Sequence, residues 1–121
     1  MTASTIPNDV LCVADYQRLA KEVLPHSIYE YIYGGGGDEL TLKQNHSALN
    51  AIQLWPRVLN DVTQGTTATT VLGELWRSPI MLAPVAFQTM VHQEGEIATA
   101  RAASALDVGM MVSTLASHSI E

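Results

Sequence analysis

The sequence has one cysteine, Cys12, among its 121 residues. A single thiol excludes a disulfide framework and a cysteine-based zinc site, because both need several cysteines at fixed spacings. Basic residues are also scarce, since six Lys and Arg stand against 12 Asp and Glu and give a formal net charge of -6. The phosphates of DNA and RNA demand a basic face. We therefore expect no nucleic-acid partner.

Long apolar runs are missing as well. No stretch approaches the roughly 18 apolar residues of a membrane span, and the N-terminus has neither the basic nor the apolar region of a secretory signal. Together with the lone cysteine, this predicts a cytoplasmic protein with no membrane partner. Apolar residues nevertheless make up 47% of the chain and charged residues 15%, a balance that indicates a folded protein.

The histidines give no metal motif. His26, His46, His92 and His118 are scattered, and no two have the i, i+4 spacing of a helical metal site. His92 and Glu94 could supply two ligands on one turn, but no third partner stands out. We expect no bound metal and assign these histidines to surface or capping roles.

Three short helices are expected in the first part of the chain. An apolar stripe with helical spacing covers residues 15–24, with Asp15 as the N-cap. The same spacing returns over residues 28–32 and must end at the four glycines of residues 34–37. Asp38 can cap a third helix, whose buried side is marked by three apolar residues, Leu42, Leu49 and Ile52.

Three tyrosines lie on the second of these helices. Tyr29, Tyr31 and Tyr33 are about 100° apart per residue, so they cannot all face one core. At least one must point elsewhere. The spacing leaves Tyr31 open between an aromatic packed under the next helix and one that aims its hydroxyl into a cleft.

The second part of the chain predicts strands. Residues 66–72 and 75–77 flank Gly73-Glu74 and indicate a β-hairpin. Apolar runs at 80–83 and 110–115 enclose an alanine-rich helix over 94–107, which is typical of a parallel β-α-β unit. Two parallel strands cannot bury both of their faces alone, and Ser117 resembles the N-cap of another helix. We therefore expect a fragment of a longer α/β protein.

Ligands in α/β folds gather beyond the carboxyl ends of parallel strands. Those ends are residues 83–88 and 113–117 here, where small residues, a proline and three hydroxyl groups could approach a flat ligand. The residues alone leave open whether these groups bind a ligand or merely cap and end local elements.

A set of motifs in fixed order adds a resemblance. The motifs are Leu24-Pro25, Tyr29-Glu30-Tyr31, Gly35-x-x-Asp38-Glu39, Pro56-Arg57-x-Leu59-x-Asp61-Val62, Leu72-Gly73, Pro79-Ile80, Ala83-Pro84-x-Ala86-x-Gln88, His92-x-Glu94-Gly95-Glu96 and Thr99-Ala100-Arg101-Ala102-Ala103. With them the chain, from about residue 15 onward, resembles the FMN-dependent 2-hydroxy acid oxidases and dehydrogenases, the family of glycolate oxidase, lactate oxidase and mandelate dehydrogenase. The resemblance implies the N-terminal part of a (β/α)8 TIM barrel: a helical segment and β-hairpin in residues 1–78, and the first β-α-β unit in residues 79–121.

The resemblance also implies a reaction. An L-2-hydroxy acid would be oxidised to the 2-oxo acid, with electrons passing through FMN to oxygen or another acceptor. The histidine base, the arginines that bind the carboxylate and a lysine near the flavin lie on later barrel strands in the family. We therefore expect no catalytic residue in these 121 residues, which alone would be inactive.

Six residues match binding positions of the family. Tyr31 is similar to the tyrosine that binds the substrate carboxylate, and Leu115 stands where many members carry an aromatic residue beside the substrate. The remaining four, Pro84, Val85, Ala86 and Ser113, are similar to residues that contact the flavin. The aliphatic Leu115 favours a substrate larger than glycolate.

Three further interpretations are compatible with the residues. The chain could be one half of a split barrel, completed by a second chain, and the resemblance implies a homo-oligomer for the full protein. Alternatively, it could be a small non-catalytic interaction module that self-associates through its open sheet edges. A third possibility, a truncated product that does not fold, would expose apolar surface and aggregate.

Overall fold

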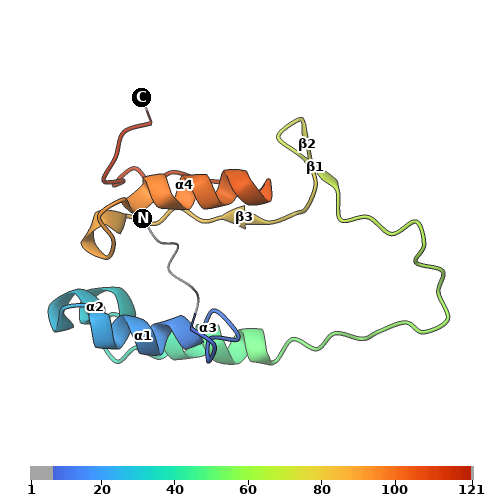
Figure 1. Ribbon diagram of the computed structural model, residues 1–121. Coiled ribbons are helices and arrows are strands. Elements are labelled where there is room, and N and C mark those ends of the chain that lie inside the picture. Colours follow the sequence, from blue (N-terminus) through green and yellow to red (C-terminus); the bar gives the residue numbers. More distant parts are fainter. Residues whose placement is uncertain (1–6, 121) are drawn as a thin grey trace. The chain divides into compact units, whose positions relative to one another are not determined.

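The computed structural model describes residues 7–120 (Figure 1). These residues form two compact units, and the boundary between them in the sequence falls between Trp55 and Pro56. No helix in the described range is both long and apolar enough to cross a membrane.

The first unit consists of three helices, as the apolar spacing predicts. They are α1 (Asp15–Val23), α2 (His26–Tyr33) and α3 (Leu40–Asn50). Pro25 separates α1 from α2, because the residue before a proline is forced out of the helical region, and Leu24 is extended at φ -80° and ψ 146°. Gly34 ends α2 in the same extended conformation. The glycine run is therefore the turn between α2 and α3.

Two predicted helix caps are wrong. Asp15 lies inside the first turn of α1, where its carboxylate accepts hydrogen bonds from the backbone N–H groups of Leu11 and Cys12 at 2.8 and 2.9 Å. The N-cap of α3 is Glu39, not Asp38, and its backbone is left-handed at φ 57°. At both helices an acidic side chain binds backbone N–H groups of the preceding turn instead. For α3 this side chain is Glu39, which accepts a hydrogen bond from the N–H of Gly35 at 3.2 Å.

The prediction of which residues of α3 are buried is only partly correct. Leu42 is half-buried, but Leu49 and Ile52 are 70% and 67% exposed. Among residues 7–120 no element covers that side of the helix, although the spacing is that of a buried one. The core of the first unit is instead Tyr29, which is 7% exposed and stacks on Tyr33 with ring centroids 5.4 Å apart.

The second unit begins with the predicted hairpin. Strands β1 (Thr69–Val71) and β2 (Glu74–Trp76) are antiparallel, with Thr70 opposite Leu75. The turn is at Leu72-Gly73, one residue earlier than the sequence suggests, and both residues have positive φ, 52° and 88°. Two positive φ values match a type I′ turn, whose twist fits that of the paired strands.

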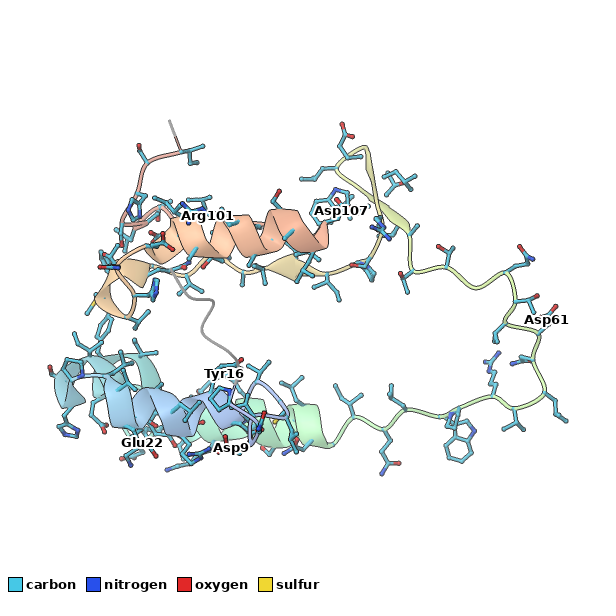
Figure 2. All side chains as sticks on the ribbon, in the orientation of Figure 1. Asp9, Tyr16, Glu22, Asp61, Arg101 and Asp107 are labelled. Carbon is cyan, nitrogen blue, oxygen red and sulfur yellow. The ribbon has the colours of Figure 1, made fainter. Side chains whose placement is uncertain are left out.

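The predicted β-α-β unit is confirmed with shorter elements. Strands β3 (Met81–Leu82) and β4 (Gly109–Met110) are parallel, and α4 (Gly95–Leu106) connects them after a short 3-10 helix, η1 (Gln88–Met90). Helix α4 runs beside β3 in Figure 1 and buries Ala103, which is 4% exposed. Asp107, labelled at the end of α4 in Figure 2, ends the helix in the left-handed region at φ 53°.

The hairpin packs against the start of β4. A Cβ atom added to Gly109 would lie 2.2 Å from a ring carbon of Trp76, so the indole occupies the space beside this glycine. Arg77 also lies 3.9 Å from the Asp107 carboxylate. The hairpin thus belongs to the same compact unit as the β-α-β segment. The division of the parent protein between residues 78 and 79 stays a prediction.

The Trp76 contact generates a stability prediction. Gly109→Ala should displace the indole, destabilise the second unit by about 1–3 kcal/mol and shift Trp76 fluorescence to longer wavelength. Emission is best read in a Trp55→Phe background, because Trp55 is the other indole and is already 89% exposed. Gly36→Ala is the matched control, since a Cβ there meets nothing within 4 Å. Equal unfolding curves for the two alanine variants would contradict this packing.

Candidate functional site

The carboxyl ends of β3 and β4 lead into two neighbouring loops. The β3 loop comprises residues 83–90 and the β4 loop residues 111–118. The N–H of Met111 donates to the carbonyl of Leu82 at 3.0 Å, and further out the N–H of Phe87 donates to the carbonyl of Leu115 at 3.1 Å. The two loops therefore continue the contact that the two short strands begin.

Five of the six predicted site residues lie in these two loops. Pro84, Val85 and Ala86 belong to the β3 loop, and the Val85 side chain is 56% exposed. Ser113 and Leu115 belong to the β4 loop, where Ser113 is half-buried and Leu115 is 55% exposed. The Ser113 hydroxyl oxygen accepts a hydrogen bond from the N–H of Leu115 at 3.1 Å, which leaves its O–H able to donate elsewhere.

Tyr31 lies in the first unit, on α2. Its side chain is 64% exposed, whereas Tyr29 on the same helix is buried. This confirms that the tyrosines of α2 do not all face one core. The exposure of Tyr31 fits a hydroxyl that serves something other than the packing of the helical unit.

A strained residue begins the short helix of the β3 loop. Phe87 has φ 52° and ψ 42°, a left-handed conformation that is costly for a bulky side chain. It is followed by η1, so the chain changes direction just after Ala86. Of the residues before this turn, Pro84 and Val85 are exposed and Ala86 is half-buried.

The sequence analysis missed the carboxylate that joins the two loops. Glu96, in the first turn of α4, is only 5% exposed. Its Oε1 accepts the N–H of Gln88 from the β3 loop at 3.2 Å and the N–H of Ser117 from the β4 loop at 2.9 Å. Its Oε2 lies 3.0 Å from Nδ1 of His118. We call Gln88, Glu96, Ser117 and His118 the Glu96 network.

Two more hydrogen bonds reinforce the Glu96 network. The Ser117 hydroxyl accepts the N–H of Thr89 at 3.2 Å, and the Thr99 hydroxyl donates to the Gln88 side-chain oxygen at 2.6 Å. Ser117 therefore binds the β3 loop, and its role as the N-cap of another helix stays a prediction. His118, expected in a surface or capping role, is half-buried and bound to Glu96.

The same contacts set the charge state of Glu96. They lower its pKa from the usual 4.5 to about 2, with the Ser117 N–H as the strongest influence and the His118 ring and Gln88 N–H acting in the same direction. Burial acts in the opposite direction but is outweighed. Glu96 is therefore a carboxylate at every physiological pH.

The loops fit an apolar, flat ligand with polar edges. Pro84 is exposed and the small Ala86 is half-buried, while the Ser113 hydroxyl supplies one polar group from the neighbouring loop. In the described range, no group of three or more His, Cys, Asp and Glu is placed to hold a metal ion.

The lowered pKa of Glu96 generates a pH prediction. The folded value lies below the unfolded one, so the contribution of this carboxylate to stability is complete above about pH 4.5 and disappears as the pH falls toward 2. A 13C NMR titration of the Glu96 side-chain carboxyl measures the midpoint directly. A midpoint near the usual glutamate value of 4.5 would show that the network does not form.

Comparisons with known proteins identify the family of the chain. The sequence profile described as FMN-dependent dehydrogenase matches residues 20–121. The chain is 42% identical to the L-lactate oxidase of Nostoc sp., over 100% of this chain and 32% of that protein. It is 44% identical to 2-hydroxyacid oxidase 1 of Homo sapiens, over 93% of this chain and 30% of that protein.

A solved structure matches the fold. The crystal structure of mandelate oxidase superposes with a TM-score of 0.82 at 42% sequence identity, covering 88% of this chain and 31% of that chain. The chain thus spans about a third of the length of the relatives it matches. The match confirms the expected α/β fold, the N-terminal part of a (β/α)8 barrel. Since the profile covers most of the sequence, the chain belongs to the family of FMN-dependent dehydrogenases.

Proposed function

We propose that this chain supplies the first two strands of an FMN-binding barrel in an enzyme that oxidises an L-2-hydroxy acid to the 2-oxo acid. The observation that carries the proposal is the joined pair of loops at the carboxyl ends of β3 and β4, in a chain of this family. Catalytic groups of (β/α)8 barrels gather at that end of the strands. Oxygen or another acceptor takes the electrons in the last step.

Four loop residues form the proposed flavin contact. The backbone of Pro84, Val85 and Ala86 lies against the ring, and the Ser113 hydroxyl donates a hydrogen bond to it. When bound, FMN accepts the two electrons that leave the substrate's α-carbon. The role of these residues is to orient the ring and to exclude water from one of its edges. Their support is the accessible β3 loop and the free donor of Ser113.

Two residues form the proposed substrate contact. The exposed Tyr31 hydroxyl donates to the substrate carboxylate, and Leu115 borders the substrate's side chain. The similar proteins carry the names of lactate, glycolate and mandelate oxidases, which share a 2-hydroxy carboxylate substrate. Because Leu115 is smaller than an aromatic residue, we expect a substrate larger than glycolate.

None of these six residues can take a proton from the substrate at neutral pH. The general base therefore comes from outside this set, and because the family's histidine base lies on a later barrel strand, we expect the 121 residues alone to be inactive. We propose that further barrel strands, in the same polypeptide or in a second chain, supply it, and that the full protein is a cytoplasmic homo-oligomer. The support is the exposed apolar surface of the β-α-β unit, where Ile80 and Met111 are 58% and 50% exposed.

The flavin proposal is tested on the protein as purified from cells. Its absorbance spectrum between about 350 and 500 nm should show a bound flavin, and the intact mass of the sample should identify any second polypeptide. A panel of 2-hydroxy acids should then bleach the flavin, with a bulky acid reducing it faster than glycolate. A colourless, discrete oligomer of the 13.1 kDa chain would instead support the self-associating interaction module.

The substrate role of Tyr31 predicts a specific kinetic change. In the complete enzyme, Tyr31→Phe removes one hydrogen bond to a charged carboxylate, so kcat/KM should fall by about tenfold to a hundredfold. The fold should be unchanged, because the Tyr31 side chain is exposed. Tyr33→Phe, on the same helix, is the control and should retain normal kinetics. Similar losses in both variants, or in neither, would contradict the assignment.

A further inference from the structure

The Glu96 network differs from an ordinary buried ion pair. The carboxylate accepts two backbone N–H groups, and they come from two different loops, 8 and 21 residues away in sequence. Its partner His118 is 22 residues away. An oxygen that binds two backbone groups fixes the distance between them, whereas an ion pair between flexible side chains does not. Glu96 thus sets the spacing of the two loops.

From Glu96 a short path of hydrogen bonds leads to the β3 loop residues proposed to face the flavin. Gln88 donates its backbone N–H to Glu96, and its side-chain amide nitrogen lies 3.5 Å from the Val85 carbonyl. Its side-chain oxygen is held by the Thr99 hydroxyl of α4. The position of the Val85 backbone therefore depends on how Gln88 is held at the start of α4.

A second path leads to the β4 loop. Ser117 donates to Glu96, and the N–H of Ala116 next to it donates to the Ser113 carbonyl at 3.1 Å. The Leu115 N–H donates to the Ser113 hydroxyl oxygen, and the Leu115 carbonyl accepts the N–H of Phe87. The orientation of the Ser113 hydroxyl is thus tied to the same carboxylate.

Both loops pack closely against the start of α4. Gly95 has φ 44°, and a Cβ atom there would lie 2.9 Å from the Thr89 methyl group and 3.4 Å from the His118 ring. Both loops therefore pack against the helix at the residue just before Glu96. A smaller residue at position 96 would leave the part-buried N–H groups of Gln88 and Ser117 without this acceptor.

We propose that Glu96 is a positioning residue, whose carboxylate holds the Pro84–Ala86 backbone and the Ser113 hydroxyl in the relative placement that flavin binding requires. The effect on flavin binding rests on the proposed function, but the hydrogen bonds themselves can be tested without flavin. Glu96 touches neither cofactor nor substrate in this scheme. It acts through Gln88 and Ser117.

The test compares three variants of the flavin-containing protein. Glu96→Ala removes the acceptor. Glu96→Gln keeps the shape and one oxygen for the two N–H groups but removes the charge. Glu94→Ala is the matched control, because Glu94 is the N-cap of α4 but pairs with Arg101 of that helix at 3.0 Å.

Amide exchange tests the hydrogen bonds of the Glu96 network, and FMN affinity and reduction potential test their effect on the flavin. In Glu96→Ala the amide protons of Gln88 and Ser117 should exchange with solvent about tenfold faster or more, and FMN should bind about tenfold more weakly, with a shifted flavin reduction potential. Glu96→Gln should give intermediate values and also covers the case in which Glu96→Ala does not fold. Glu94→Ala should match the wild type in both.

Each of the three other outcomes of this experiment contradicts one part of the proposal. Unchanged exchange of the Gln88 and Ser117 amides in both Glu96 variants would overturn the network itself. Faster exchange with unchanged FMN affinity and potential would reduce Glu96 to a structural residue and overturn its positioning role. A wild-type protein that carries no flavin would overturn the proposed function, and the exchange data would then report on the network alone.

Discussion

The buried carboxylate of Glu96 is the contact on which the arrangement of the candidate site depends. Strands β3 and β4 share only two residue pairs, which is too short a ladder to fix the loops that follow them. Glu96 adds hydrogen bonds to both loops from the first turn of the helix between the strands, where a negative charge also suits the helix dipole. At the carboxyl ends of its strands, the β-α-β unit is therefore held together more by the hydrogen bonds of Glu96 than by strand pairing.

The rest of the second unit is open. Ala103 is the one apolar residue of this unit below a tenth exposed in the described range, and large apolar residues such as Ile80 and Met111 remain at least half exposed. Parallel strands with apolar residues need cover on both faces. This supports further strands and helices around β3, β4 and α4, as a barrel would provide, and it explains why the polar network rather than a core holds the loops.

Much of this fold could be predicted from local patterns. The three helices follow from apolar spacing broken by Pro25 and Gly34, and the β-α-β unit follows from two apolar runs around an alanine-rich helix. The caps were less predictable, because Asp15 and Glu39 bind backbone groups before their helices. Glu96 could not be assigned from local sequence, since its partners are 8 to 22 residues away. Only the motif containing Glu94 and Glu96 pointed to this position, without indicating its role.

The central claim is that the β3 and β4 loops form one side of a flavin site. A crystal structure of the protein isolated with its flavin tests this most directly. The account predicts the isoalloxazine ring against the Pro84–Ala86 backbone, within hydrogen-bonding distance of the Ser113 hydroxyl, with Glu96 still bound to Gln88 and Ser117. A flavin bound elsewhere on the protein, with these two loops apart or covered by other side chains, would contradict it.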